Sequence, residues 1–217
     1  MSLQTLLEET RAGASKRIPE EALAVMRAAD EELVAKGVGQ NALKVGDTLP
    51  DATFTSATGD TVQMSSLLAN GPLIINFYRG GWCPYCNFEL KAYQDILGDI
   101  TALGAQLVAV TPEKPDNSLS TTEKNALTFP VLTDNENAFA KALGIAFELP
   151  KPLQELYGKF GMDLPGLNAG SGWSLPIPAT FVVDANGKIV LADVDVNYTR
   201  RLEPTDALAA LKASVAA

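Results

Sequence analysis

The sequence predicts an α/β domain built around a mixed β-sheet, with a helical extension before it. Three observations carry this prediction. An apolar stretch of strand length, 72–78, is followed within a few residues by apolar positions at helical spacing. A second buried strand, 106–110, precedes further helical segments. Near the C-terminus, two apolar runs flank the tight-turn signal Asn186-Gly187, which predicts a hairpin. This order of elements is typical of a sheet with both parallel and antiparallel neighbours.

The helical extension is predicted to occupy residues 1–42, and the main domain residues 43–217. Residues 3–35 have the pattern of two amphipathic helices, broken just before Pro19, which suits a first helical turn. The extension is acidic and carries no chemical motif. We therefore expect it to serve packing or self-association, for example in a homodimer.

The remaining elements follow from periodicity and from turn signals. Segment 147–178 is rich in Gly and Pro without clear periodicity, and we expect it to be a long loop with a functional role. The other expected elements are strands at 52–56, 61–64, 73–78, 106–110, 129–132, 179–184 and 188–194, and helices from the cysteine pair to about 103 and at 117–126, 137–143 and 204–215.

Composition and charge exclude several classes of function. Of the 217 residues, 47% are hydrophobic and 20% are charged, which is typical of a soluble globular protein. The formal charge of −9 argues against binding to nucleic acid or to anionic membranes. Because neither a signal peptide nor a transmembrane stretch is visible in the sequence, we expect a cytoplasmic protein.

The run Trp82-Cys83-Pro84-Tyr85-Cys86 holds both cysteines of the chain, at the junction between a predicted strand and a predicted helix. Two thiols at this spacing can close and reopen a small disulfide ring. The amides at the start of a helix stabilise an anion, so a thiol there has its pKa lowered from about 8.5 to roughly 7 or below. The pair therefore predicts a dithiol redox site.

Two other interpretations of the cysteine pair are weaker. A zinc site needs three or four ligands, and the chain has neither a third cysteine nor any histidine. Plain core filling does not account for Trp, Pro and Tyr crowded around both thiols. We therefore expect no metal and no organic cofactor, and activation of the thiol must come from the helix, a cation or a carboxylate.

Several motifs together resemble the alkyl hydroperoxide reductase/thiol-specific antioxidant family, the peroxiredoxin-like branch of the thioredoxin-fold superfamily. The resemblance runs from about Leu43 to the C-terminus. It implies a thioredoxin-like fold, in which a mixed central sheet is flanked by helices, and the chemistry of a thiol peroxidase. The motifs that carry it are Val45-Gly46-Asp47 with Pro50-Asp51, Phe129-Pro130-Val131-Leu132 with Asp134, Ala140 to Gly144, and Thr180-Phe181-Val182-Val183-Asp184 with Gly187.

The cysteine site fits two family patterns that differ in the attacking sulfur. Trp82 and the two cysteines resemble the W-C-x-x-C of thioredoxin, in which the first cysteine attacks and the second resolves. Pro178 supports this alignment, since it stands where thioredoxin-like oxidoreductases carry a cis-proline beside the disulfide. Its alternative interpretation is a proline at the start of a strand.

The second pattern is the peroxiredoxin P-x-x-x-T-x-x-C, with a Glu three residues after the cysteine. It places Cys86 at the attacking position, Cys83 at the Thr, Glu89 at the Glu and Arg79 at the Pro. Helix geometry favours Cys83 as the more accessible thiol, whereas the peroxiredoxin pattern favours Cys86, and the sequence leaves the order of attack open.

The arginine that peroxiredoxins carry before the hairpin motif falls at Pro178, so a thiolate-stabilising charge must come from elsewhere. Arg79 is the nearest cation in sequence, and Arg200 and Arg201 lie after the last predicted strand. For each of these arginines, an exposed surface position is the interpretation that composition favours.

Three functions remain. The first is a thiol peroxidase that reduces hydrogen peroxide and organic hydroperoxides and is recycled by a thioredoxin-like donor. The second is an oxidoreductase that exchanges thiols with protein or small-molecule disulfides. The third is a sensor that uses the pair as a redox switch without turnover.

Overall fold

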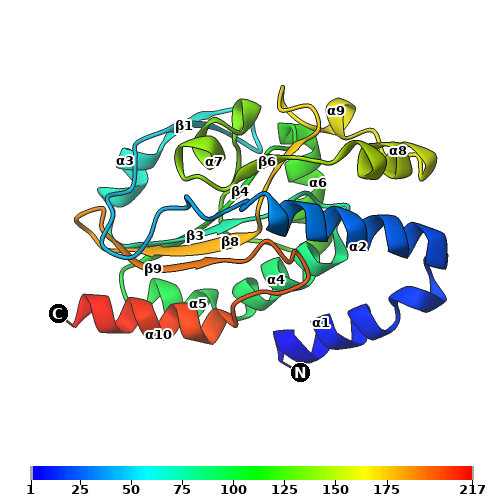
Figure 1. The fold of residues 1–217 in the computed structure, drawn as a ribbon. Helices are drawn as coiled ribbons and strands as arrows, with labels where there is room; N and C mark the ends of the chain where they lie inside the picture. Colours follow the sequence, from blue (N-terminus) through cyan, green and yellow to red (C-terminus); the bar gives the residue numbers. More distant parts are fainter. Residues whose placement is uncertain (1, 217) are drawn as a thin grey trace.

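A seven-stranded sheet forms the centre of the computed structural model, which describes residues 2–216 (Figure 1). The strand order is β2-β1-β5-β4-β3-β8-β9. The pairs β3–β4 and β4–β5 are parallel, whereas the other neighbours are antiparallel, so the predicted mixed sheet is confirmed. The strands are β1 (Thr53–Ser56), β2 (Thr61–Gln63), β3 (Leu73–Phe77), β4 (Gln106–Thr111), β5 (Val131–Thr133), β8 (Ala179–Val183) and β9 (Ile189–Val194).

Helices cover both faces of this sheet (Figure 1). On one face lie α4 (Pro84–Asp95), α5 (Leu97–Thr101) and α10 (Pro204–Val215), and on the other lie α3 (Met64–Leu68) and α7 (Ala138–Ala142). Helix α6 (Pro115–Asn125) packs beside α4 and β5. The short 3-10 turn η2 (Asn135–Asn137) leads into α7.

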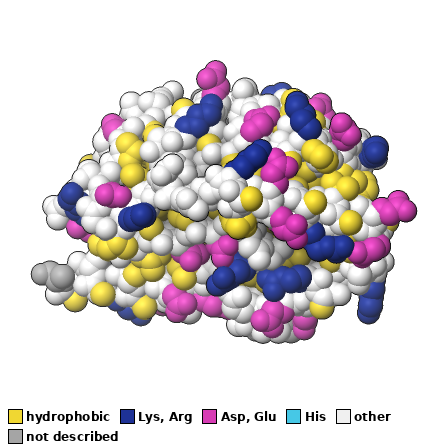
Figure 2. Space-filling model, in the orientation of Figure 1, with side chains coloured by type: hydrophobic (Ala, Val, Ile, Leu, Met, Phe, Trp, Pro, Cys, Tyr) yellow, Lys and Arg dark blue, Asp and Glu magenta, His cyan; other side chains and the backbone are white. Residues whose placement is uncertain are grey.

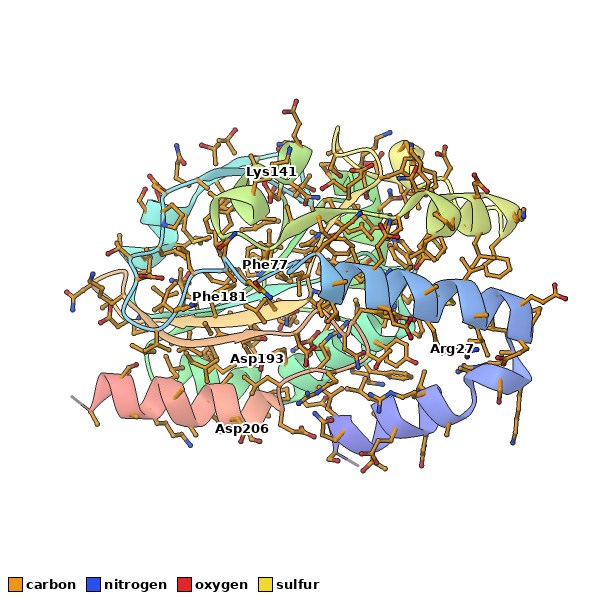
Figure 3. All side chains as sticks on the ribbon, viewed as in Figure 1. Arg27, Phe77, Lys141, Phe181, Asp193 and Asp206 are labelled. Atoms are coloured by element: carbon orange, nitrogen blue, oxygen red, sulfur yellow. The ribbon has the colours of Figure 1, made fainter. Side chains whose placement is uncertain are left out.

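The two faces of the sheet bury separate apolar clusters because successive side chains of a strand point to opposite sides. Ile74 belongs to the cluster under α4 and α10, whereas Leu73, Ile75 and Phe77 belong to the cluster under α3 and α7. Figure 3 shows Phe77 and Phe181 inside the second cluster, where their rings meet edge to face at 6.1 Å.

The N-terminal extension folds as α1 (Leu3–Ala12), a short turn η1 (Ala14–Lys16) and α2 (Glu20–Ala35). The break before Pro19 lies where the sequence places it. Leu3 and Leu7 of α1 are buried in the same cluster as both cysteines, and α2 packs on α8 (Lys151–Lys159). The extension therefore packs against the residues of the cysteine site.

The expectation of a long loop at 147–178 is wrong. This segment contains β6 (Ala146–Glu148), α8, α9 (Leu164–Leu167) and β7 (Ser174–Pro176). Its prolines suggested irregular structure, yet Pro152 and Pro165 stand in the first turns of α8 and α9. Proline is tolerated there because the first amides of a helix have no partner within it.

Other boundaries differ by a few residues. The helix expected to reach residue 103 is divided at Ile96, whose backbone leaves the helical region, so that α4 and α5 are separate. The short helix α3 was not expected, because it follows β2 without an intervening turn signal.

The visible surface carries acidic and basic side chains interspersed with apolar patches (Figure 2). Within residues 2–216, the structure contains no helix with the length and apolar character needed to cross a bilayer.

Phe139 of α7 offers a direct test of the second cluster. Its ring is buried, meets Phe54 edge to face at 5.1 Å and stacks on Phe77 at 5.7 Å. We predict that Phe139→Ala lowers the free energy of unfolding by about 3–5 kcal/mol, because a large aromatic cavity remains. Chemical denaturation measures this loss. The control Leu119→Ala removes a side chain that is 40% exposed and should change stability by no more than about 0.5 kcal/mol.

Candidate active site

The cysteine pair lies where β3 ends and α4 begins. Cys83 is the N-cap residue of α4, and Pro84 stands in its first turn. The Cys83 amide donates to the carbonyl of Gly80 at 3.1 Å, and the Asn87 side-chain amide donates to the carbonyls of Gly81 and Cys83, each at 2.8 Å. These bonds fix the turn before the helix, so Cys83 sits at the positive end of the α4 dipole.

Glu113 supports the same turn and was missed by the sequence analysis. Its carboxylate accepts a hydrogen bond from the Gly81 amide at 2.8 Å, and only 3% of the residue is exposed. Burial raises the pKa of Glu113 to about 7, although the bond from Gly81 opposes this shift. A carboxylate directly after a buried strand, in Thr111-Pro112-Glu113, is the signal that could have found it.

Both thiols are free and buried, with exposed fractions of 1% for Cys83 and 0% for Cys86. Both are buried because the aromatic ring of Tyr85 and helix α1 pack in the same cluster. The two cysteines still differ in access, since Cys83 lines a surface pocket together with Trp82 and Tyr85. Cys86 does not line this pocket.

The environment separates the acidities of the two thiols. Burial raises the pKa of Cys83, but the hydrogen bond with Cys86 and the charges of Arg79 and Arg201 outweigh burial and lower the pKa to about 6. Burial and the neighbouring Cys83 raise the pKa of Cys86 well above its ordinary value. The electrostatics of the pair therefore favour the thiolate on Cys83 and the protonated thiol on Cys86.

Arg201 brings a buried positive charge beneath the pair, so the expected surface position is wrong. Its guanidinium donates to the Glu89 carboxylate at 2.6 Å and to the Cys86 sulfur at 3.4 Å. Glu89 is 1% exposed, and burial raises its pKa to about 7 against the opposing charge of Arg201. Its Nη1 donates to the carbonyls of Tyr198 and Arg200, so each nitrogen of the guanidinium has at least one partner.

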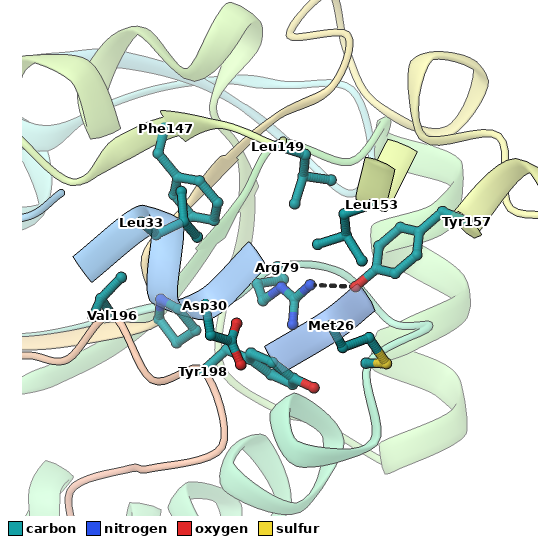
Figure 4. Close-up of a pocket in the computed structure, with 11 residues that line it drawn as sticks. Met26, Asp30, Leu33, Arg79, Phe147, Leu149, Leu153, Tyr157, Val196 and Tyr198 are labelled. Atoms are coloured by element: carbon teal, nitrogen blue, oxygen red, sulfur yellow. Dashed lines mark hydrogen bonds between the residues drawn. The ribbon is translucent and has the colours of Figure 1, made fainter. Parts of the chain in front are cut away.

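Arg79 is also buried, with 3% exposed, and the expected surface position is wrong for it as well. Its guanidinium donates to the Tyr157 hydroxyl at 2.8 Å and lies over the rings of Trp82 and Tyr198, 4.8 and 4.3 Å from their centroids. Figure 4 shows Arg79 in a pocket that also holds Asp30 of α2.

Asp30 and Arg200 complete the charges around the site. Burial raises the pKa of Asp30 to about 6, although the positive charge of Arg79 opposes the shift. Arg200 is exposed and pairs with Asp195 at 3.2 Å, so it agrees with the expected surface position.

Pro178 lines the same pocket as Arg79, at the point where the chain passes from β7 to β8. Its peptide bond is trans, because residues 2–216 contain no cis peptide, so the expected cis-proline is wrong. The chain is nearly continuous in extended form from Ser174 to Val183, and this segment needs no turn at Pro178. Of the predicted site residues, Trp82 and Arg79 line the pocket of Cys83, and Glu89 is joined to Cys86 through Arg201. Pro178 lines the neighbouring pocket of Arg79, which contains neither cysteine.

The buried ion pair yields a stability prediction. Arg201→Met should lower the free energy of unfolding by about 3–5 kcal/mol, because the Glu89 carboxylate then lacks its buried partner. The double variant Arg201→Met/Glu89→Gln removes both charges and should lose less stability than the single variant. Urea unfolding measures the free energy of unfolding of both variants. A double variant that is less stable than the single variant would contradict this account of the ion pair.

The thiol acidities yield a pH prediction. In Cys86→Ser the hydroxyl still donates to Cys83, so alkylation of Cys83 by iodoacetamide should be slow below pH 6, fast above it, and half-maximal near pH 6. In Cys86→Ala the donor is lost, and the midpoint should rise by about one to two pH units, since a hydrogen bond to a charged group is worth about 1.5–3 kcal/mol. Equal midpoints in the two variants would show that this hydrogen bond does not set the acidity.

Comparisons with known proteins agree with this geometry. The model of the AhpC/TSA family matches residues 45–192. A candidate peroxiredoxin of Mycobacterium tuberculosis is 31% identical over 157 residues, which cover 72% of this chain and 88% of that protein. The thiol-disulfide oxidoreductase ResA of Geobacillus thermodenitrificans is 24% identical over 151 residues, 69% of each chain.

A solved structure shares the fold. The crystal structure of peroxidoxin BcpB from Mycobacterium tuberculosis superposes with a TM-score of 0.62 at 22% identity, and the match covers 79% of this chain and 97% of that one. The structure confirms the predicted fold class, and the family match confirms the resemblance that the motifs indicate. The chain therefore belongs to the AhpC/TSA family, the thiol-dependent peroxidases of the thioredoxin-fold superfamily.

Proposed function

We propose that this chain reduces hydrogen peroxide and organic hydroperoxides by cycling Cys83 and Cys86 between dithiol and disulfide. A thioredoxin-like protein is the electron donor in this proposal, and the reducing cytoplasm is the compartment that suits it. The observation that carries the proposal is the contrast between the thiols. Cys83 has a lowered pKa and lines a pocket, whereas Cys86 is protonated and buried one helical turn away.

In the first step the Cys83 thiolate attacks one oxygen of the peroxide. The S–O bond forms as the O–O bond breaks, the second oxygen leaves as an alkoxide or hydroxide that takes a proton from water, and Cys83 becomes a sulfenic acid. The start of α4 and the guanidinium groups of Arg79 and Arg201 stabilise the thiolate before attack. This assignment makes Arg79 and Arg201 positioning and charge-stabilising residues.

In the second step the Cys86 sulfur attacks the sulfenic sulfur of Cys83. The S–S bond forms, the S–O bond breaks, and water leaves with the proton that Cys86 gives up. Arg201 lies 3.4 Å from the Cys86 sulfur and stabilises the negative charge that develops as the proton departs. A donor dithiol then reduces the disulfide by two exchange steps, which returns both thiols and oxidises the donor.

A second candidate is thiol–disulfide exchange without peroxide. The W-C-x-x-C run and the similarity to ResA favour it. A thiolate on Cys83 would attack a substrate disulfide, and Cys86 would then release the mixed disulfide. The two functions use the same thiols and differ in the oxidising substrate, which is a peroxide in one and a disulfide in the other. The substrate that the protein reduces faster therefore distinguishes them.

The test is peroxide consumption coupled to thioredoxin and its reductase. We predict turnover by the wild type far above that of a free thiol, and loss of turnover in both Cys83→Ser and Cys86→Ser. The variants should differ in intact mass after peroxide, because only Cys86→Ser retains the attacking thiol and gains oxygen. Ser66→Ala, which removes an exposed hydroxyl on α3, on the face of the sheet opposite α4, is a control that should behave as the wild type.

One outcome would contradict the peroxidase proposal, and another would contradict the assignment of the attacking thiol. Peroxide consumption no faster than that of free thiol, together with rapid reduction of oxidised glutathione or insulin disulfides, would instead support the oxidoreductase. Gain of oxygen in Cys83→Ser, with none in Cys86→Ser, would reverse the roles of the two thiols.

A further inference from the structure

The pocket that reaches Cys83 has walls from two parts of the chain. One wall belongs to the main domain and includes Trp82, Tyr157 and Tyr198 around the thiol. The other wall belongs to the N-terminal extension, which contributes Thr10, Ala14, Arg17, Ile18, Leu23 and Met26. The thiol is therefore approached between the main domain and a segment outside the family match at residues 45–192.

The pocket is far larger than hydrogen peroxide requires. Its volume is about 320 Å³, at the lower end of the range of small-molecule sites. A single water needs only about 10–15 Å³ of such space, and hydrogen peroxide is only slightly larger than water. Most of the pocket is thus free to hold a substituent on the peroxide.

The lining is mainly apolar and aromatic. Ile18, Leu23 and Met26 supply aliphatic and thioether surface from the extension, opposite Trp82 and other rings of the main domain. No carboxylate lines this pocket among the described residues, and its two cations are Arg79 and Arg17. The Arg79 guanidinium donates to Tyr157 and lies against the rings of Trp82 and Tyr198, and Arg17 donates to the Thr10 carbonyl. Most of the surface that remains for a ligand is apolar or aromatic, and it favours an apolar group.

The extension is held in place, so this wall exists before substrate binds. Gln4 of α1 donates from its backbone amide to Glu203 at 2.8 Å and from its side chain to the Arg201 carbonyl at 2.7 Å. Arg11 donates to Thr199 at 3.1 Å, and Ala29 of α2 is buried in one apolar cluster with residues of α8. A preformed wall contributes to affinity without the cost of ordering a loop.

We infer that the N-terminal extension is the specificity element of the peroxide site, in which Ile18, Leu23 and Met26 select hydroperoxides with a bulky apolar substituent over hydrogen peroxide. This inference rests on the proposed function for its substrate, because the substituent fills the pocket while the O–O bond faces Cys83. A hydroperoxide with a tertiary aryl group, such as cumene hydroperoxide, has the size and chemistry that the pocket requires.

The experiment compares kcat/KM for cumene hydroperoxide and for hydrogen peroxide in the full chain. Ile18→Trp places a large ring in the pocket and should lower the ratio of the two values by about tenfold or more, in line with the discrimination of hydrophobic pockets. Leu23→Ala removes part of the wall and should lower the same ratio about threefold. Val34→Trp adds a ring on α2 at a side chain that is 60% exposed and outside this pocket, and it should leave both values unchanged.

Binding of cumyl alcohol, which cannot oxidise a thiol, gives a readout that is independent of turnover. Calorimetry should detect binding to the wild type and to Val34→Trp, and at least tenfold weaker binding to Ile18→Trp. Far-UV circular dichroism establishes that each variant is folded. If the wild type reduces neither hydroperoxide, the proposed function fails, and the binding series alone decides whether the extension forms a ligand wall.

Three results would overturn the inference. One is an equal effect of Ile18→Trp on both hydroperoxides, and another is cumyl alcohol binding that Ile18→Trp leaves unchanged. The third is an Ile18→Trp variant with an unchanged ratio of the two kcat/KM values but slower reduction of its disulfide by thioredoxin. That result would make this surface the docking site of the reductant instead.

Discussion

The contact of Arg201 with Glu89 and Cys86 is the interaction on which the site depends. A guanidinium with 6% of its residue exposed is costly to bury without partners, and here its three nitrogens donate to one carboxylate, one sulfur and two carbonyls. The resulting charge lies beneath the first turn of α4. Together with Arg79 and the helix dipole, it favours a thiolate on Cys83 even though the sulfur is buried.

The same arginine links three distant parts of the chain. It comes from the segment after β9, contacts α4 through Glu89, and has its carbonyl bound by Gln4 of α1. The N-terminal extension therefore supports the segment that carries the buried charge, and it also walls the pocket at Cys83. The extension lies outside the family match at residues 45–192. It contacts the segment of Arg201, whose charge stabilises the thiolate, and it also lines the pocket that leads to Cys83.

Much of the fold was predictable from the sequence because its signals are local. The apolar run of β3, the cysteine junction and the turn at Asn186-Gly187 all appear where the sequence predicts them. Segment 147–178 was misjudged because Pro152 and Pro165 begin helices rather than exclude them. At the site, the cysteines are readable from the sequence, but the burial of Arg201 is not, since its partner Glu89 is 112 residues away. The rings of Tyr157 and Tyr198 that contact Arg79 also come from distant elements, so no local sequence pattern predicts the burial of Arg79.

The central claim is that Cys83 is the sulfur that attacks. The most direct measurement exposes reduced Cys83→Ser and Cys86→Ser, which lack the second thiol, to one equivalent of peroxide in the presence of dimedone, and locates the sulfenic acid adduct by peptide mass spectrometry. An adduct on Cys83 is the predicted result, because that sulfur has the lowered pKa and lines the pocket. An adduct on Cys86 alone would contradict the account and would assign the Arg201 contact to the attacking thiolate instead.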